Sequence, residues 1–101
     1  MYIPRFCRDG VLPGYAKDIP EDTLRSLDLF VSDHCAPGGF LEALLTNNLF
    51  ATMRYADDAN RPQIGNILML LWNENVPACC WMNDDNYAAW LNQRRIDDGE
   101  R

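Results

Sequence analysis

The sequence predicts an all-α fold, a small single-domain bundle of four to five helices with an irregular N-terminal arm. Apolar residues recur at helical spacing in successive segments. Proline or glycine separates these segments, and none shows the apolar–polar alternation of a half-buried strand. The length of 101 residues suits one domain. We expect an extended arm over residues 1–18, a helical domain over residues 19–95 and a flexible acidic tail over residues 96–101.

Proline and glycine interrupt the N-terminal arm at Pro4, Gly10 and Pro13-Gly14. Its apolar side chains are numerous enough to pack it against the helical body, with a short strand or hairpin as an alternative. If the arm does not pack, it is an interaction segment.

The first helix is predicted to begin near Pro20, because proline suits the first helical position and acidic residues follow it. It ends before Pro37, and its apolar stripe consists of Leu24, Leu27, Phe30 and Val31. The pair Gly38-Gly39 then gives the backbone a freedom that other residues lack. A second helix follows, and its expected buried face consists of Phe40, Leu41, Leu44 and Leu45.

A polar run, Thr46-Asn47-Asn48, interrupts the second helix before another helical stretch that contains Leu49, Phe50 and Met53. The next helix is expected from about residue 58 to residue 75, with an apolar face of Ile64, Ile67, Leu68, Leu71 and Trp72. Met69 and Leu70 widen that face almost all the way round, which is typical of a central helix or an oligomer interface. The last helix follows the capping residues Asn83-Asp84-Asp85.

The formal net charge is −6. Direct binding to nucleic acid or anionic lipid needs clustered lysine and arginine, so we expect neither. The longest apolar run, Ile67 to Trp72, is too short to cross a membrane, and the N-terminus does not have a signal-peptide pattern. We therefore expect a cytoplasmic protein whose four cysteines are reduced.

Catalytic and cofactor motifs are missing from the sequence, so we expect a non-enzymatic protein without a cofactor. His34 precedes Cys35, but adjacent side chains at a helix end point in different directions. Zinc binding by these two residues with Cys79 and Cys80 lacks the two-residue gap that lets two thiolates hold one ion. We predict no catalytic residue and no metal site.

Candidate binding residues are mostly amides and acids beside apolar helices: Asn47, Asn48, Asp57, Asp58, Asn60, Asn73, Glu74 and Trp81. Asparagine is unfavourable inside a helix because its side chain competes for backbone hydrogen bonds. The asparagines therefore form either buried hydrogen bonds that fix helix register or a recognition face, and helix capping is the plainer role for the aspartates. Trp81 is the expected surface anchor, whereas Trp72 and Trp90 are expected in the core.

Short motifs occur in a fixed order along the chain: Ile19-Pro20-Glu21-x-Thr23, Pro37-Gly38-Gly39-Phe40-Leu41-x-Ala43-x-Leu45-x-Asn47-x-Leu49-Phe50, Ala56-Asp57-x-x-Asn60, Asn73-Glu74-x-x-Pro77, Cys80-Trp81 and Trp90. Over residues 19–91 this order resembles a family of small helical proteins encoded by tailed phages and prophages. Members usually carry Asp in place of Asn48 and Gly-Ser in place of Met82-Asn83. The resemblance implies a phage or prophage origin, and it implies no activity.

The leading interpretation is an accessory protein that binds a host or phage protein and modulates a host or defence protein. One alternative is an acidic inhibitor that mimics phosphate groups, which requires the acids to gather on one face. Another is a self-assembling module, a homodimer formed through the apolar helix that contains Met69 and Leu70.

Overall fold

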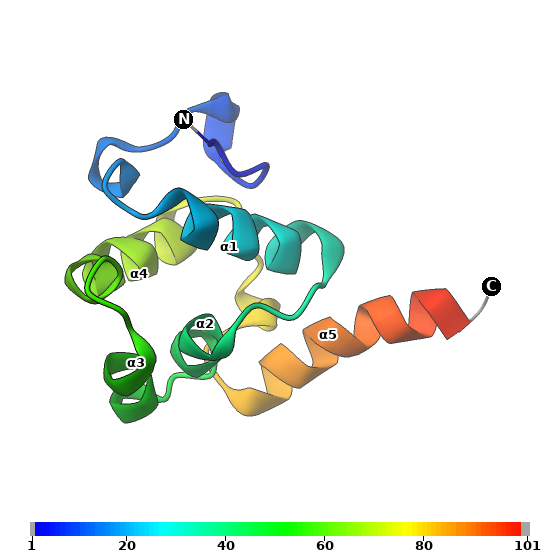
Figure 1. Ribbon diagram of the computed structural model, residues 1–101. Coiled ribbons are helices and arrows are strands. Elements are labelled where there is room, and N and C mark those ends of the chain that lie inside the picture. The colour runs from blue at the N-terminus through cyan, green and yellow to red at the C-terminus, as the bar shows by residue number, and fades with distance from the viewer. Residues whose placement is uncertain (1, 100–101) are drawn as a thin grey trace.

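The computed structural model describes residues 2–99, with side chains described as far as residue 93. Over that range the α-helices are α1 (Glu21–Asp33), α2 (Gly39–Leu45), α3 (Leu49–Tyr55), α4 (Ile64–Asn73) and α5 (Asp84–Gly99). The remaining elements are 3₁₀ turns, η1 (Arg8–Gly10), η2 (Gly14–Ala16), η3 (Arg61–Gln63) and η4 (Ala78–Cys80), and the described residues form no strand. The prediction of a small all-α bundle is confirmed (Figure 1).

The N-terminal arm packs against the helical body, as expected. Its apolar side chains Phe6, Leu12 and Ala16 are buried within the same cluster as the helices. The backbone carbonyl of Phe6 also accepts a 3.0 Å hydrogen bond from the N–H of Asn75, just beyond α4. Figure 1 shows the arm lying across α1 and α4. The arm forms η1 and η2 instead of a strand or hairpin.

The hydrophobic core lies between α1, α2 and α4. The predicted stripe of α1 is fully confirmed, because all of its apolar members are buried. From α2 and α4 the core takes Leu41, Leu44, Leu45, Ile67, Leu70 and Leu71. Trp81, from the segment before α5, and Tyr87, from the first turn of α5, complete the cluster. Of the expected α2 face, only Phe40 lies at the margin, half-buried.

Two helix boundaries differ from the prediction. The helix expected from residue 58 begins at Ile64, because the preceding residues form a turn that ends in η3. In that turn the Asp57 carboxylate accepts the backbone N–H of Asn60 at 2.8 Å. The last helix continues to Gly99, so residues 96–99 are helical, and the rest of the expected tail lies outside the described residues.

Helix α3 differs from the other helices in how little it gives to the core. Thr52 is its only buried residue, and Leu49, Phe50 and Met53 are all exposed. The interruption before α3 was predicted correctly, and Asn47 adopts φ 63°, in the left-handed region that asparagine tolerates better than most residues. Within residues 2–99, no helix is both long enough and apolar enough to cross a membrane.

Candidate functional site

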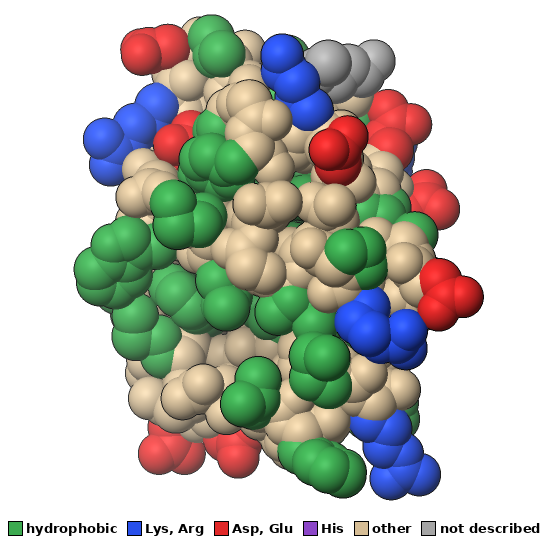
Figure 2. Space-filling model, turned by 90° about the vertical axis from the view of Figure 1, so that its left-hand side faces the viewer, with side chains coloured by type: hydrophobic (Ala, Val, Ile, Leu, Met, Phe, Trp, Pro, Cys, Tyr) green, Lys and Arg blue, Asp and Glu red, His purple; other side chains and the backbone are tan. Residues whose placement is uncertain are grey.

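The surface over α3 and α4 carries a group of exposed apolar side chains that we call the apolar face. Its members are Leu49, Phe50, Met53, Leu68, Met69 and Trp72. Phe50 is 81% exposed and Trp72 is 69% exposed, values that are unusual for aromatic side chains of this size. Figure 2 looks onto the side of the molecule that carries α3 and α4, where hydrophobic side chains gather while charged side chains lie mainly around the margins.

Helical spacing brings these side chains together on each helix. Leu49 and Met53 are four residues apart on α3, as are Leu68 and Trp72 on α4. The two helices meet at a shallow hollow of about 50 Å³ whose lining includes Leu49 and Leu68. Arg54 is the only charged residue within α3 and α4, so the apolar face is nearly free of charge on a protein of net charge −6.

The tryptophans of this region occupy places opposite to those expected. Trp81, predicted as a surface anchor, is only 8% exposed and belongs to the core. Trp72, predicted in the core, lies on the apolar face. The expected core stripe of α4 is correct at Ile67 and Leu71 but wrong at Leu68 and Trp72, because a helix that is apolar on almost every side does not reveal which side faces inward.

Leu70 is fully buried, whereas Met69 is 48% exposed. A homodimer through α4 could therefore use Met69 but not Leu70.

A second surface feature is a groove of about 700 Å³ between α2, α3 and α5. Small residues make up much of its lining, and Glu42 from α2 and Asp84 from α5 add carboxylates. Tyr87 also lines the groove, although its side chain is only 6% exposed and its ring stacks on Phe30 at 5.4 Å between ring centres. Burial raises the pKa of Tyr87 to about 12, and the nearby Glu42 carboxylate contributes in the same direction.

Most of the predicted binding residues serve local structure. The Asn48 side chain caps α3 by accepting the N–H of Ala51 at 3.1 Å. Asn60 is 91% buried, since it is 9% exposed, and its amide oxygen accepts the Thr23 hydroxyl at 2.6 Å. The Asn60 amide also donates to Asp57 at 3.0 Å. For Asn60, the alternative of a buried hydrogen bond that fixes packing is therefore correct.

The remaining predicted residues are spread over the molecule. Asp58 is exposed and pairs with Arg61 at 3.1 Å. Glu74 follows α4 and accepts the backbone N–H of Arg8 at 3.0 Å, which ties the arm to that helix. Asn73 is the half-buried last residue of α4, whereas Asn47 lines the hollow beside the apolar face.

The predicted acids lie at three places along the chain. Asp57 and Asp58 precede α4 and Glu74 follows it, and this helix of 10 residues is about 15 Å long. Asp84 and Asp85 lie elsewhere, in the first turn of α5. Phosphate mimicry by these acids stays a prediction.

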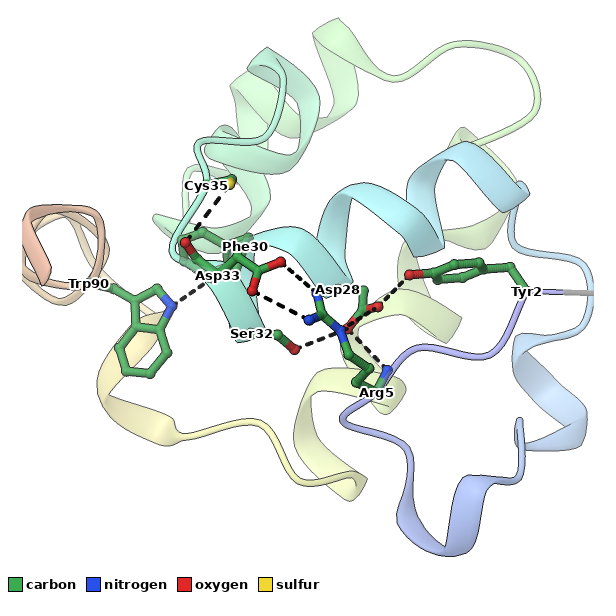
Figure 3. A network of polar contacts seen from close by, with 8 residues as sticks. All are labelled: Tyr2, Arg5, Asp28, Phe30, Ser32, Asp33, Cys35 and Trp90. Atoms are coloured by element: carbon green, nitrogen blue, oxygen red, sulfur yellow. Dashed lines mark hydrogen bonds and ion pairs between the residues drawn. The ribbon is translucent and has the colours of Figure 1, made fainter. Parts of the chain in front are cut away.

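The polar network around Asp28 was not predicted from the sequence (Figure 3). Asp28 is only 1% exposed and accepts hydrogen bonds from the Tyr2 hydroxyl, from the Ser32 hydroxyl at 3.0 Å and from the backbone N–H of Arg5 at 3.0 Å. The Arg5 side chain bridges Asp28 at 3.2 Å and Asp33 at 2.7 Å.

Burial alone would raise the pKa of Asp28, but the hydrogen bonds from Tyr2, Arg5 and Ser32 outweigh it and lower the pKa. Asp28 is not a member of the predicted apolar stripe of α1, and no sequence signal marks its partners Tyr2 and Arg5 in the N-terminal arm. The network fastens the arm to α1. We assign it a structural role because its polar atoms are satisfied within the protein.

The residues weighed for chemistry also contact the protein itself. The Nδ1 atom of His34 donates to the backbone carbonyl of Trp90 at 2.9 Å, and the Trp90 indole N–H donates to the carbonyl of Phe30 at 2.7 Å. These contacts join α5 to the end of α1. The described residues include no group of three or more histidine, cysteine, aspartate or glutamate side chains placed to hold a metal ion.

The four cysteines form no disulfide with one another. Burial raises the pKa of Cys7 to about 11 and that of Cys80 to about 12, so both are held as neutral thiols at neutral pH.

Comparisons with family models, curated proteins and solved structures give no match to this chain. Support for a function therefore comes from the geometry of the surface.

Proposed function

We propose that the protein is a non-enzymatic accessory protein of phage or prophage origin, which acts in the bacterial cytoplasm by binding a host or phage protein through the apolar face. The observation that supports binding is the exposure of Phe50 and Trp72 on two helices that together contain a single charged residue. Contiguous exposed apolar patches mark interaction sites, and aromatic anchors supply much of the energy of protein interfaces. The family resemblance of residues 19–91 supports the proposed origin.

Folding does not require these side chains at the surface. The core is filled by α1, α2, α4, the arm, the segment before α5 and Tyr87 of α5, while the only buried residue of α3 is Thr52. A partner that covers Phe50 and Trp72 would remove their apolar area from water. This burial stabilises a complex by roughly 25 cal/mol for each Å² of apolar surface. The apolar face therefore offers binding energy that the folded monomer does not use.

The test is affinity capture from the bacterial host with a matched pair of variants. The face variant combines Phe50→Ser with Trp72→Ser. The control variant combines Val11→Ser with Leu29→Ser, which removes exposed apolar residues outside the apolar face. We expect the wild type and the control to retain one stoichiometric partner at high salt, and the face variant to lose it. Equal capture by the face variant would contradict the proposal.

A homodimer through the same surface is the second candidate function. It is favoured by the lack of acids within α3 and α4, since two copies of a protein with net charge −6 repel each other less across this surface than across others. Sedimentation equilibrium separates the two candidates. A wild-type dimer that the face variant converts to a folded monomer supports self-assembly, and a wild-type monomer at high concentration rejects it.

A further inference from the structure

We infer that the groove between α2, α3 and α5 binds a basic segment of the partner's chain, an arginine- or lysine-rich peptide stretch that lies beside the partner's apolar contact. This inference rests on the proposed function, because it assigns a second part of the same interface. It follows from the groove's size, its charge, a polar group without a partner and its position beside the apolar face.

The size of the groove suits a short peptide segment or a small ligand. Its volume of about 700 Å³ lies within the range of about 300–1,000 Å³ that is usual for binding clefts. Several lining residues have small side chains, Gly39, Ala43, Ala51 and Ala88, so a bound chain could approach the helix backbones closely. The groove is an open surface feature that a peptide can enter without a change in the fold.

The charge of the groove specifies the kind of ligand. Glu42 and Asp84 contribute carboxylates from two different helices, and the lining includes no lysine or arginine. Neither carboxylate forms a salt bridge with a described residue. A cationic side chain beside either carboxylate would form a charge-assisted hydrogen bond, which is the stronger kind.

The polar group without a partner is the hydroxyl of Tyr87. The Tyr87 side chain is 94% buried, since only 6% is exposed, and no hydrogen bond joins its hydroxyl to a described residue. The ring packs on Phe30 in the core, so the groove is where the hydroxyl meets solvent. A phenolic oxygen accepts a hydrogen bond from an ammonium or guanidinium group.

The position of the groove explains why the ligand is a segment of the same partner. Helix α3 separates the two surfaces: Leu49, Phe50 and Met53 belong to the apolar face, whereas Ala51 and Tyr55 line the groove. A protein seated on the apolar face therefore has the mouth of the groove one helix width away. The exposed ring of Tyr55 also borders the groove, and the Arg54 guanidinium lies 5.9 Å from the centre of that ring.

The experiment measures the affinity of a short labelled peptide that alternates arginine and alanine, by fluorescence anisotropy at physiological ionic strength. A peptide with glutamine in place of arginine is the ligand control. Ala88→Lys places a positive charge in the groove, and Ala89→Lys places the same charge on the adjacent exposed position, which does not line the groove. Glu42→Gln is paired with Glu21→Gln, an exposed acid at the start of α1.

We expect Ala88→Lys and Glu42→Gln to weaken binding of the arginine peptide about tenfold or more, as the loss of one charge-assisted hydrogen bond predicts, while the two controls change it less than about twofold. Tyr87→Phe, which keeps the ring, should weaken binding by a smaller factor. Equal effects of Ala88→Lys and Ala89→Lys would show that only net charge matters and would overturn the inference. Absence of binding would also overturn it, as would tighter binding of spermine than of the peptide.

The face variant distinguishes failure of the inference from failure of the proposed function. Phe50 and Trp72 do not line the groove, so the variant should bind the arginine peptide as the wild type does. Loss of peptide binding in a folded face variant would overturn the assignment to the groove. Retained peptide binding together with unchanged capture of the partner would leave the groove standing and contradict the apolar face.

Discussion

The side of the molecule formed by the arm and α1 contrasts with the side formed by α3 and the outer surface of α4. On the first side, Phe30 is fully buried and the Asp28 carboxylate receives donors from three residues. On the second side, Phe50 and Trp72 stand in solvent. The first side shows what this chain needs in order to fold, and the second shows apolar area in excess of that need.

The largest expected difference is in unfolding free energy, between a substitution of Phe30 on the first side and one of Phe50 on the second. Phe30→Ala should lower the free energy of unfolding by about 3–5 kcal/mol, because it leaves a cavity between α1 and Tyr87. Phe50→Ala removes the same atoms from a site that is 81% exposed, and should change stability by less than about 0.5 kcal/mol. Urea unfolding of both variants measures the difference. Similar losses would mean that α3 is packed more tightly than the structure shows.

The buried carboxylate gives the next largest effect. Asp28→Ala leaves the hydroxyls of Tyr2 and Ser32 and the backbone N–H of Arg5 without their acceptor, and should cost about 2–3 kcal/mol of unfolding free energy. Asp58→Ala, which breaks an exposed pair with Arg61, is the control and should cost less than about 1 kcal/mol. Chemical denaturation at pH 7 measures both. A cost for Asp28→Ala no larger than that of the control would show that the arm is not fastened by this network.

The helix cap on the α3 side gives a smaller effect. Asn48→Ala removes the acceptor for the N–H of Ala51 and should destabilise the protein by about 1 kcal/mol. Asn48→Asp keeps an oxygen acceptor at the cap and should retain most of the wild-type stability. Thermal unfolding followed by circular dichroism compares the two variants. If Asn48→Asp is as unstable as Asn48→Ala, the side chain does not act as a cap.

The smallest expected effect is the pH dependence that Asp28 confers. Its pKa is lowered in the folded state, so the unfolded chain takes up the proton first as pH falls. The stabilisation is therefore complete above the unfolded pKa of about 4 and is lost as pH falls through the lower folded pKa. Unfolding free energies below pH 4 should decline less steeply for Asp28→Asn than for the wild type. Equal slopes would show that other carboxylates dominate acid unfolding.

The sequence predicted the elements better than it predicted their outward faces. The α1 stripe was correct because its apolar residues occupy one side of the helix and Pro37 ends the segment clearly. The core side of α4 was partly wrong because Leu68, Met69, Leu70 and Trp72 surround the helix, so periodicity could not say which of them faces inward.

The candidate site followed the same pattern. Helix capping was predicted for Asp57, but its carboxylate closes the turn that precedes η3. Asn48 was assigned to helix register or recognition, and it caps α3 instead. The buried hydrogen bond between Asn60 and Thr23 joins residues 37 positions apart, and the bond from Tyr2 to Asp28 joins residues 26 apart. Local propensity carries no information about partners so distant in sequence. The predicted burial of Trp81 and Trp72 was reversed for the same reason. Tertiary packing alone decides which of two tryptophan side chains is buried.

The most direct test of the apolar face is the accessibility of the Trp72 indole N–H in solution, measured by paramagnetic relaxation with a soluble gadolinium chelate, before and after the captured partner is added. The three tryptophan indole signals of the wild type are assigned with Trp72→Phe and Trp81→Phe. In the dilute free protein we expect strong broadening of the Trp72 signal and weak broadening of the Trp81 signal, followed by protection of Trp72 in the complex. A Trp72 signal as protected as that of Trp81 in the free protein, or still accessible in the complex, would contradict the account.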